Sequence, residues 1–257
     1  MCKIKQKQHG FTLVELSVVI VLIGLIVAGV IGAQNLVELA KSRKLMGQIQ
    51  SFKVAFNTFY LEFEQYPGDM SNASSYWSSC TTANGSVCNG DGNRRYGSRG
   101  SNEGERGWHH LSLAGLLPYS FDNSSYGAVI GGWASESKPG VTSPKFDQYA
   151  TNEICAKFWR ESHSLFGSLS GKNIITIRGI IPTDANHTCW QGNAGIPVKV
   201  AHQIDNKLDD GEMRTGHMTV IGTWGGSSDG TCHNGSLNWA FDGGEGQGCN
   251  MFISLRE

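Results

Sequence analysis

The sequence has little charge and no clear excess of either sign. Among its 257 residues there are 21 Lys and Arg against 22 Asp and Glu, the formal net charge is −1, and charged residues make up only 17% of the chain. Proteins that bind a nucleic-acid backbone concentrate positive charge on one surface. The charge balance therefore gives no electrostatic reason to expect nucleic-acid binding.

Short catalytic motifs are also missing. The sequence contains no HExxH or P-loop pattern, so it lacks the usual local signs of a catalytic zinc site or a phosphate-binding loop. The adjacent residues His109 and His110 are not a chelating pair by themselves, because neighbouring side chains on a helix point about 100° apart. We expect a protein that is not an enzyme.

Proline is scarce, with six residues in the chain, and none of them lies within residues 11–66. A helical pattern runs through this stretch and stops at Pro67, and a helix of this length would be about 80 Å long. Its first part, residues 11–33, is an apolar run that is long enough to span a bilayer. Its second part, residues 34–66, is amphipathic.

The apolar run has a basic flank and contains one acid. Residues 1–10 include three lysines and no acid, which predicts that this end stays in the cytoplasm and that the rest of the chain lies outside. An ordinary signal peptide is the alternative, but its apolar region is shorter. Glu15 lies inside the run, where a carboxylate is costly unless it is paired or protonated. It is therefore a functional candidate, unless it lies near the membrane edge and its side chain reaches the interface.

Residues 10–16 (GFTLVEL) resemble the N-terminal signal of type IV prepilins and pseudopilins. That family has a short basic leader, a Gly, an aromatic residue that is usually Phe, and a Glu as the fifth residue of the mature chain. The resemblance implies that a prepilin peptidase cuts between Gly10 and Phe11 and methylates the new amine of Phe11. It also implies that Glu15 pairs with the N-terminal amine of a neighbouring subunit, which would give a buried carboxylate a cationic partner.

The resemblance further implies a pilin-like α+β fold, in which the second half of the long helix packs on an antiparallel β-sheet. The sequence supports this arrangement because apolar residues follow alternating steps of four and three along one stripe of the helix. The members of this stripe are Leu45, Ile49, Phe52, Phe56, Phe59 and Phe63. We expect the stripe to form the core of the globular domain; a coiled coil with a partner is the alternative.

We expect three parts in the precursor. These are a cytoplasmic leader (1–10), the long helix (11–66) and an extracytoplasmic globular domain (67–257) with long loops pinned by disulfides. Within the domain, further helices are predicted at residues 105–117 and 152–166. Runs of β-branched and apolar residues predict strands at residues 174–181, 196–200, 218–224 and 251–255.

The cysteine pattern fits an oxidising compartment such as the periplasm or the cell exterior. None of the seven cysteines forms a CxxC motif, which argues against a structural zinc site. Removal of residues 1–10 takes Cys2 away and leaves six cysteines, which can form up to three disulfides in several connectivities. These six are Cys80, Cys88, Cys155, Cys189, Cys232 and Cys249. Cys80 and Cys88 are close enough in sequence for a local disulfide.

The best candidate for a metal site is a group of acids beside a glycine turn, at Asp205, Asp209, Asp210 and Glu212. Such carboxylates can wrap Ca²⁺, which takes about six to eight oxygen ligands. The spacing is not that of an EF-hand, and Asp-Asp-Gly is also common in ordinary turns, so both interpretations stay open. A second, weaker candidate is formed by Asn89, Asp91 and Asn93.

We expect a pilin-like subunit, either a minor pilin or a pseudopilin. It would sit in the inner membrane as a single-pass precursor with its globular domain in the periplasm, and then join a type IV pilus or a type II secretion pseudopilus. Its partners would be the prepilin peptidase, other pilin or pseudopilin subunits and the inner-membrane assembly platform.

Two other functions are weighed against this one. The first is a filament-borne binding module, an adhesin or a DNA-uptake pilin. DNA uptake would need a basic patch, for which the only cluster is Arg94, Arg95, Arg99 and Arg106. The second is a membrane-tethered enzyme that does not polymerise, for which Glu15 would be dispensable.

Overall fold

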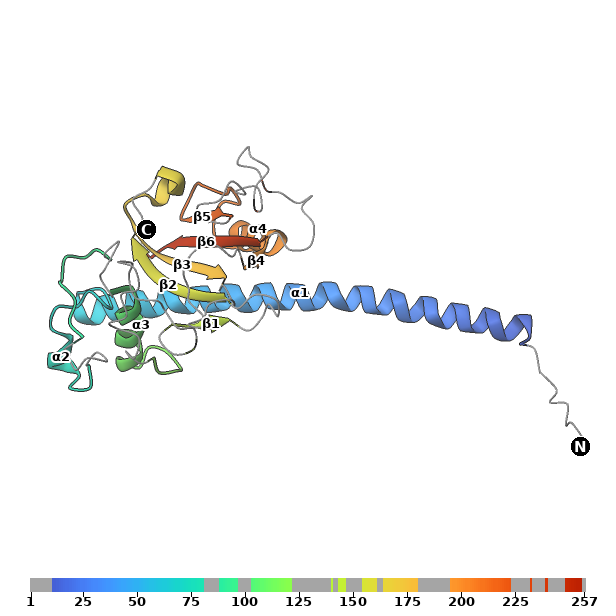
Figure 1. Cartoon of the computed structure of the whole chain (residues 1–257), viewed down its shortest axis with the longest axis horizontal. Coiled ribbons are helices and arrows are strands. Elements are labelled where there is room, and N and C mark those ends of the chain that lie inside the picture. Colours follow the sequence, from blue (N-terminus) through green and yellow to red (C-terminus); the bar gives the residue numbers. More distant parts are fainter. Residues whose placement is uncertain are drawn as a thin grey trace, which may run out of the picture. The chain divides into compact units, whose positions relative to one another are not determined.

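The structure, a computed structural model, combines a long helix with an antiparallel β-sheet (Figure 1). It divides into two compact units, Met1–Lys41 and Ser42–Glu257, which we describe separately. The α+β class expected from the sequence is confirmed. The residues that the structure describes are 11–80, 88–96, 103–121, 140, 143–146, 154–160, 164–179, 195–222, 232, 239 and 248–255.

Helix α1 spans Leu13–Phe63, which is 51 residues without interruption. It ends three residues before Tyr66, where the sequence analysis placed its end. Glu64 stops it, because this residue has a φ of +53° and its N–H donates to the Tyr60 carbonyl oxygen at 2.9 Å. A left-handed residue in this position is a common helix end. In the first unit the helix is long and apolar enough to cross a membrane.

The stripe on the second half of α1 lies in the core of the second unit. Its members from Leu45 to Phe59 have no exposed surface, and Phe63 is partly buried. The ring centroid of Phe52 lies 4.9 Å from that of Trp108 and 6.0 Å from that of Phe146. Phe56 reaches Phe158 in the same way, at 5.9 Å. The stripe therefore forms the core, as its spacing predicts.

The sheet has six strands, and every neighbouring pair is antiparallel. Their order is β1-β2-β3-β6-β4, and β5 also pairs with β6. The strands are β1 (Lys145–Phe146), β2 (Ile154–Arg160), β3 (Asn173–Gly179), β4 (Ile196–Pro197), β5 (Met218–Ile221) and β6 (Gly248–Ser254).

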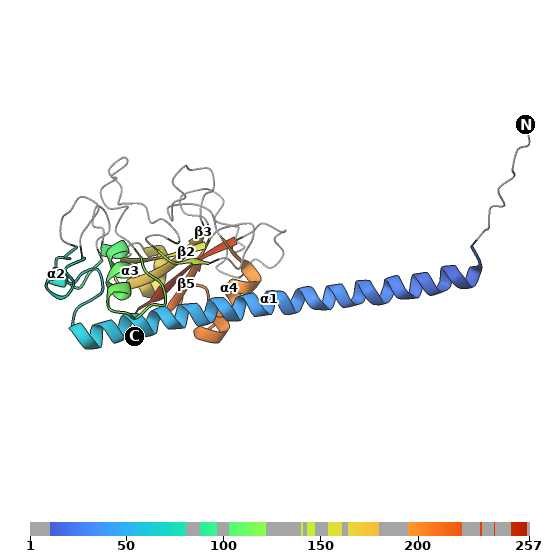
Figure 2. The same ribbon diagram turned by 90° about the horizontal axis from the view of Figure 1, so that it is seen from below.

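Side chains on the two faces of the sheet enter different apolar clusters. On one face, Ile175, Val220 and Met251 join the large core that contains the α1 stripe. The segment of α1 in the second unit runs along β2, β3 and β5 (Figure 2). On the other face, Ile174 and Phe252 form a smaller cluster that includes a residue of the short 3-10 segment η1 (Ser164–Leu169). Residues of β5 and β6 are buried throughout.

Two of the local predictions were wrong. Residues 152–166, expected to be helical, contain strand β2, which pairs along its whole length with β3. Its Ala156 and Phe158, two residues apart, are both buried, which is the period of a strand. Residues 196–200 were expected to be a strand, but the strand ends at Pro197 and helix α4 (Val198–Leu208) follows.

The other helices flank the core. Helix α3 (Glu103–Leu113) lies inside the predicted range of residues 105–117 apart from its first turn, and α2 (Ala73–Tyr76) is a single short turn. Gly107 lets α3 approach the sheet, because a Cβ there would lie only 2.5 Å from the ring of Phe158.

Two disulfides are present among the described residues. They join Cys80 to Cys88 and Cys232 to Cys249, with a Cα–Cα distance of 5.3 Å in each. The first is the local disulfide expected from the sequence, and the second holds strand β6. The side chain of Cys155 and the whole of Cys189 lie outside the described residues.

Candidate functional site

The first turn of α1 holds Glu15 in a reciprocal set of hydrogen bonds with Thr12. The Thr12 N–H and hydroxyl both donate to Glu15 Oε2, at 2.8 and 2.9 Å, and the Glu15 N–H donates to Thr12 Oγ1 at 3.2 Å. This is a capping box, which satisfies two backbone N–H groups at the start of a helix. The capping box was not predicted above, although the T-x-x-E spacing is its usual sequence signal.

Phe11 lies immediately before this turn and is 90% exposed. The other processing residue, Gly10, lies outside the described residues. Beyond the capping box, the apolar side chains of the first unit are exposed along the helix, Leu13 by 85% and Leu25 by 67%. Such a surface suits a membrane or the apolar faces of other helices.

A group of carboxylates lies where α4 ends. Asp205, Asp209 and Asp210 each offer an oxygen atom, and these atoms lie within 4.8 Å of one another. Asp205 and Asp209 are one helical turn apart, and the Asp209 N–H donates to the Asp205 carbonyl oxygen at 2.7 Å. The structure therefore brings three of the four acids named from the sequence into one group. Glu212 is not a member of it.

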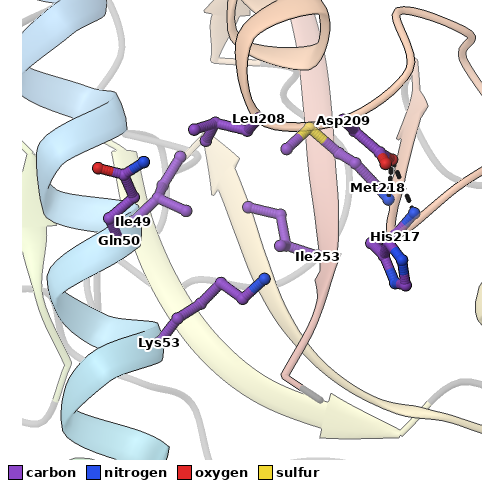
Figure 3. A pocket seen from close by; sticks show the side chains of 8 residues that line it. All are labelled: Ile49, Gln50, Lys53, Leu208, Asp209, His217, Met218 and Ile253. Carbon is purple, nitrogen blue, oxygen red and sulfur yellow. Dashed lines mark hydrogen bonds between the residues drawn. The ribbon is translucent and has the colours of Figure 1, made fainter. Parts of the chain in front are cut away.

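Two of these carboxylates are held by neighbouring donors. Asp209 Oδ2 accepts the N–H groups of His217, at 2.7 Å, and Met218, at 2.6 Å (Figure 3). Asp210 Oδ1 accepts the Glu212 N–H at 2.9 Å, and its Oδ2 accepts the Thr215 hydroxyl at 2.5 Å. The Thr215 bond is the main reason why the pKa of Asp210 is lowered. Both side chains are thus oriented by the turn that follows α4.

Asp205 differs from its two neighbours. It has no exposed surface, and neither of its carboxylate oxygens has a hydrogen-bond partner within the described chain. Burial raises the pKa of Asp205 to about 7, and the charges of Asp209, Asp210 and Glu212 act in the same direction. Among the described residues, the ionised side chain therefore has no cationic or donating partner to offset its burial.

A second carboxylate group joins Asp69, Asp91 and Glu103. Asp69 is buried and accepts the N–H groups of Asn93, at 3.1 Å, and Arg94, at 2.7 Å. Burial raises the pKa of Asp69 to about 7. Only Asp91 of this group was named from the sequence. Asp69 and Glu103 escaped because they are distant in the chain, so no local pattern links them.

The amides of the weaker sequence candidate are engaged inside the loop. Asn89 Oδ1 accepts the Ser74 N–H at 2.9 Å, and Asn93 Oδ1 accepts the Arg95 N–H at 2.7 Å. These bonds shape the loop and occupy oxygens that a cation would need.

His110 is a buried structural residue. Its Nδ1 accepts the Gly68 N–H at 2.8 Å, and its Nε2 lies 3.0 Å from the carbonyl oxygen of Cys88, to which it donates as the neutral tautomer. Burial lowers the pKa of His110 to about 3, so the ring is neutral at physiological pH. It joins α3 to the disulfide loop and to the turn after α1.

The basic residues considered for DNA binding differ in their exposure and in their hydrogen bonds. Arg94 and Arg95 are exposed, whereas Arg106 donates to the carbonyl oxygen of Asn89 at 2.7 Å and so holds the loop. Arg99 lies outside the described residues.

In the comparisons with known proteins, a family model matches the N-terminal part of the chain. No curated protein and no solved structure matches the chain. A family model described as the prokaryotic N-terminal methylation motif matches residues 5–31. The match covers residues 5–10 of the basic leader, the Gly10–Phe11 junction, the capping box and most of the apolar run. Residues 5–31 of this chain are therefore the N-terminal methylation motif, the signal of type IV pilins and pseudopilins.

Proposed function

We propose that this protein is a minor pilin or pseudopilin that assembles through α1 into a type IV pilus or a type II secretion pseudopilus. The methylation motif at residues 5–31 carries the proposal. It is supported by the exposed apolar surface of α1 in the first unit and by the separate compact unit that begins at Ser42. The protein has a structural role, and other components supply the energy of assembly.

Processing would create an N-terminal amine that can pair with the Glu15 carboxylate. Cleavage between Gly10 and Phe11 leaves a new amine one helical turn before Glu15. In the single chain the Glu15 carboxylate is held by the N–H and hydroxyl of Thr12. In an apolar helix bundle, the amine of a neighbouring subunit would bind this carboxylate more strongly than a neutral donor does. The pair would also fix the axial register of the subunits, because only one register lets it close.

The leader, the apolar helix and the disulfides together suggest where the protein is located. The precursor spans the inner membrane once, with residues 1–10 in the cytoplasm, where the prepilin peptidase acts. The unit from Ser42 onward lies in the periplasm, where its disulfides can form. Assembly with other pilin or pseudopilin subunits, at an inner-membrane platform, moves it into a filament.

The test combines processing with assembly. Mass spectrometry of the protein from its native host should find a chain that starts at methylated Phe11. Glu15→Gln should leave cleavage and membrane insertion intact and reduce the filament fraction by at least about tenfold, since about 1.4 kcal/mol is enough for that change. Glu38→Gln, the same change further along α1, is the control and should assemble normally.

Two results would refute the proposal: a mature protein that keeps residues 1–10, or a Glu15→Gln subunit that enters filaments as well as the wild type. Labelling of intact cells then distinguishes the two filaments. A pilus subunit is labelled at the cell surface, whereas a pseudopilus subunit is reached only after the outer membrane is opened.

A further inference from the structure

We propose that the turn after α4 binds one divalent cation, of the size of Ca²⁺, through the carboxylates of Asp205, Asp209 and Asp210. This site is independent of the proposed filament function, because it lies wholly in the unit that begins at Ser42. Three observations support it: a buried carboxylate with no partner among the described residues, carboxylate oxygens close enough to share one ion, and ligands that are already oriented.

The first observation is the state of Asp205. Its side chain is fully buried, and within the described residues neither Oδ1 nor Oδ2 has a hydrogen-bond partner. A buried charge without a partner is strongly unfavourable. Protonation would remove the charge, but it would add an O–H donor that also needs an acceptor. A cation satisfies the carboxylate oxygens directly.

The second observation is the spacing and chemistry of the ligand atoms. The oxygens of the three aspartates lie within 4.8 Å of one another. Oxygens up to about 4.8 Å apart can bind the same Ca²⁺ ion, because each Ca–O distance is about 2.4 Å. Mg²⁺ requires shorter distances and stricter octahedral geometry. The ligands are all oxygen, which favours a hard cation over zinc or copper.

The third observation is that the turn fixes the ligands before any ion arrives. Asp209 is held through Oδ2 by the N–H groups of His217 and Met218, which leaves Oδ1 outside these bonds. Gly216 makes this possible: its φ is +61°, and a Cβ there would lie 2.3 Å from Asp209 Oδ2. Pre-ordered ligands reduce the entropy lost on binding.

Among the described residues, nearby basic side chains do not neutralise the three aspartates. Lys53 and His217 line a small pocket together with Asp209 (Figure 3). Even so, the described part of the chain has no ion pair between Lys53 and the three aspartates. Asp210 is exposed, so a cation can enter from solvent on its side of the group.

A cation here would connect α4 to the sheet. Asp205 and Asp209 belong to the end of α4, and Asp209 also holds Met218, the first residue of β5. Strand β5 pairs with β6, which lies between β3 and β4 in the sheet order. Because the ligand group exists only in the folded chain, calcium binding should stabilise the folded state.

The experiment uses the full chain in detergent, stripped of metal with a chelator and titrated with calcium chloride or magnesium chloride. Thermal unfolding is followed by circular dichroism. A calcium concentration about a hundred times the dissociation constant should raise the Tm by about 5 °C or more. Magnesium should raise it less.

Trp239 provides a direct probe of binding. Its indole N–H donates to the carbonyl oxygen of Gly211 at 3.0 Å, next to the ligand Asp210. A Tb³⁺ ion in the site should therefore emit when tryptophan is excited, and calcium should displace it and quench this emission.

Single-residue variants test whether calcium binds at this site or at acidic residues elsewhere in the chain. Asp205→Asn should abolish both the calcium-dependent rise in Tm and the Tb³⁺ signal. Asp91→Asn, the same chemical change in the other carboxylate group, is the matched control and should keep both responses. Should Asp205→Asn fail to fold, Asp210→Asn replaces it, because Asp210 is exposed; it should weaken calcium binding at least about tenfold.

The proposal is overturned if millimolar calcium leaves the Tm of the wild type unchanged and Tb³⁺ gives no sensitised emission. It is also overturned if the aspartate variants of the site respond to calcium as the wild type does, since the ion would then bind elsewhere. Neither result bears on Glu15, so failure here leaves the filament proposal untouched.

Discussion

At the residue scale, the capping box at the start of α1 gives Thr12 a role that is separate from that of Glu15. Thr12→Val keeps the shape of the side chain but removes the hydroxyl that accepts the Glu15 N–H. Loss of such a cap costs about 1 kcal/mol, so the Glu15 amide should exchange its hydrogen about fivefold faster in the detergent-solubilised subunit. Hydrogen exchange of Thr12→Ser should match the wild type. Equal exchange in Thr12→Val would contradict the role of the cap.

Individual site residues could be predicted where the signal was local. Glu15 is conspicuous because it is an acid in an apolar run, and the three aspartates at the end of α4 lie within six positions of one another. What the sequence could not reveal is their environment: that Asp205 is fully buried while Asp210 is exposed depends on the packing of α4. The partnership of Asp69 with Glu103 depends on how distant segments meet.

At the element scale, the stripe on α1 could be predicted because one helix face alone fixes its spacing. Strand β2 could not, because residues 152–166 mix charged and apolar side chains in a pattern that a helix also tolerates. Its pairing with β1 on one side and β3 on the other decides the outcome, and such long-range pairing overrides local preference. At α4, a run of β-branched residues suggested a strand, but the burial of Val200, Ala201 and Ile204 follows a helical face.

The stripe leads to a prediction about stability. Phe56 has no exposed surface, and its ring lies 5.2 Å from Tyr66 and 5.9 Å from Phe158, measured between centroids. Phe56→Ala should lower the free energy of unfolding by about 3–5 kcal/mol through lost burial and a new cavity. Val54, two residues earlier on the same helix, is 64% exposed, and Val54→Ala should change it by only about 0.5 kcal/mol.

Denaturant unfolding of the full chain in one detergent compares these two variants of α1 directly. Equal losses for Phe56→Ala and Val54→Ala would mean that the stripe is not the core. A loss in Val54→Ala alone would mean that the opposite face of the helix is the buried one.

At the scale of the whole molecule, the α+β class and the prepilin-type signal could be predicted from the sequence. Both predictions rest on composition and local pattern, which are visible without any tertiary contact. The order of the strands was beyond reach, because β6, the last strand of the chain, lies between strands that precede it. Only the folded chain shows that β6 is an inner strand of the sheet and not an edge strand.

The stability of the molecule should depend on pH through His110, which is buried and neutral. Its pKa falls from 6.5 to about 3 on folding, mainly because of burial, while His109 and Arg106 also oppose its protonation. Below pH 6.5 the unfolded chain gains a proton that the folded chain does not, so stability is lost as the pH falls. Between pH 6.5 and 4 this loss amounts to about 3 kcal/mol.

Comparison with a variant isolates this contribution from the buried carboxyls. The pKa values of Asp69 and Asp205 are raised to about 7, so these groups act in the opposite sense and lose stability as the pH rises from about 4 to 7. Their contribution is shared by the wild type and His110→Gln and largely cancels in the difference. Denaturant unfolding should therefore show the wild type losing stability relative to His110→Gln as the pH falls from 6.5 to 4. Parallel curves would mean that His110 is protonated in the folded chain, and its hydrogen bonds to Gly68 and Cys88 would then need another tautomer or charge state.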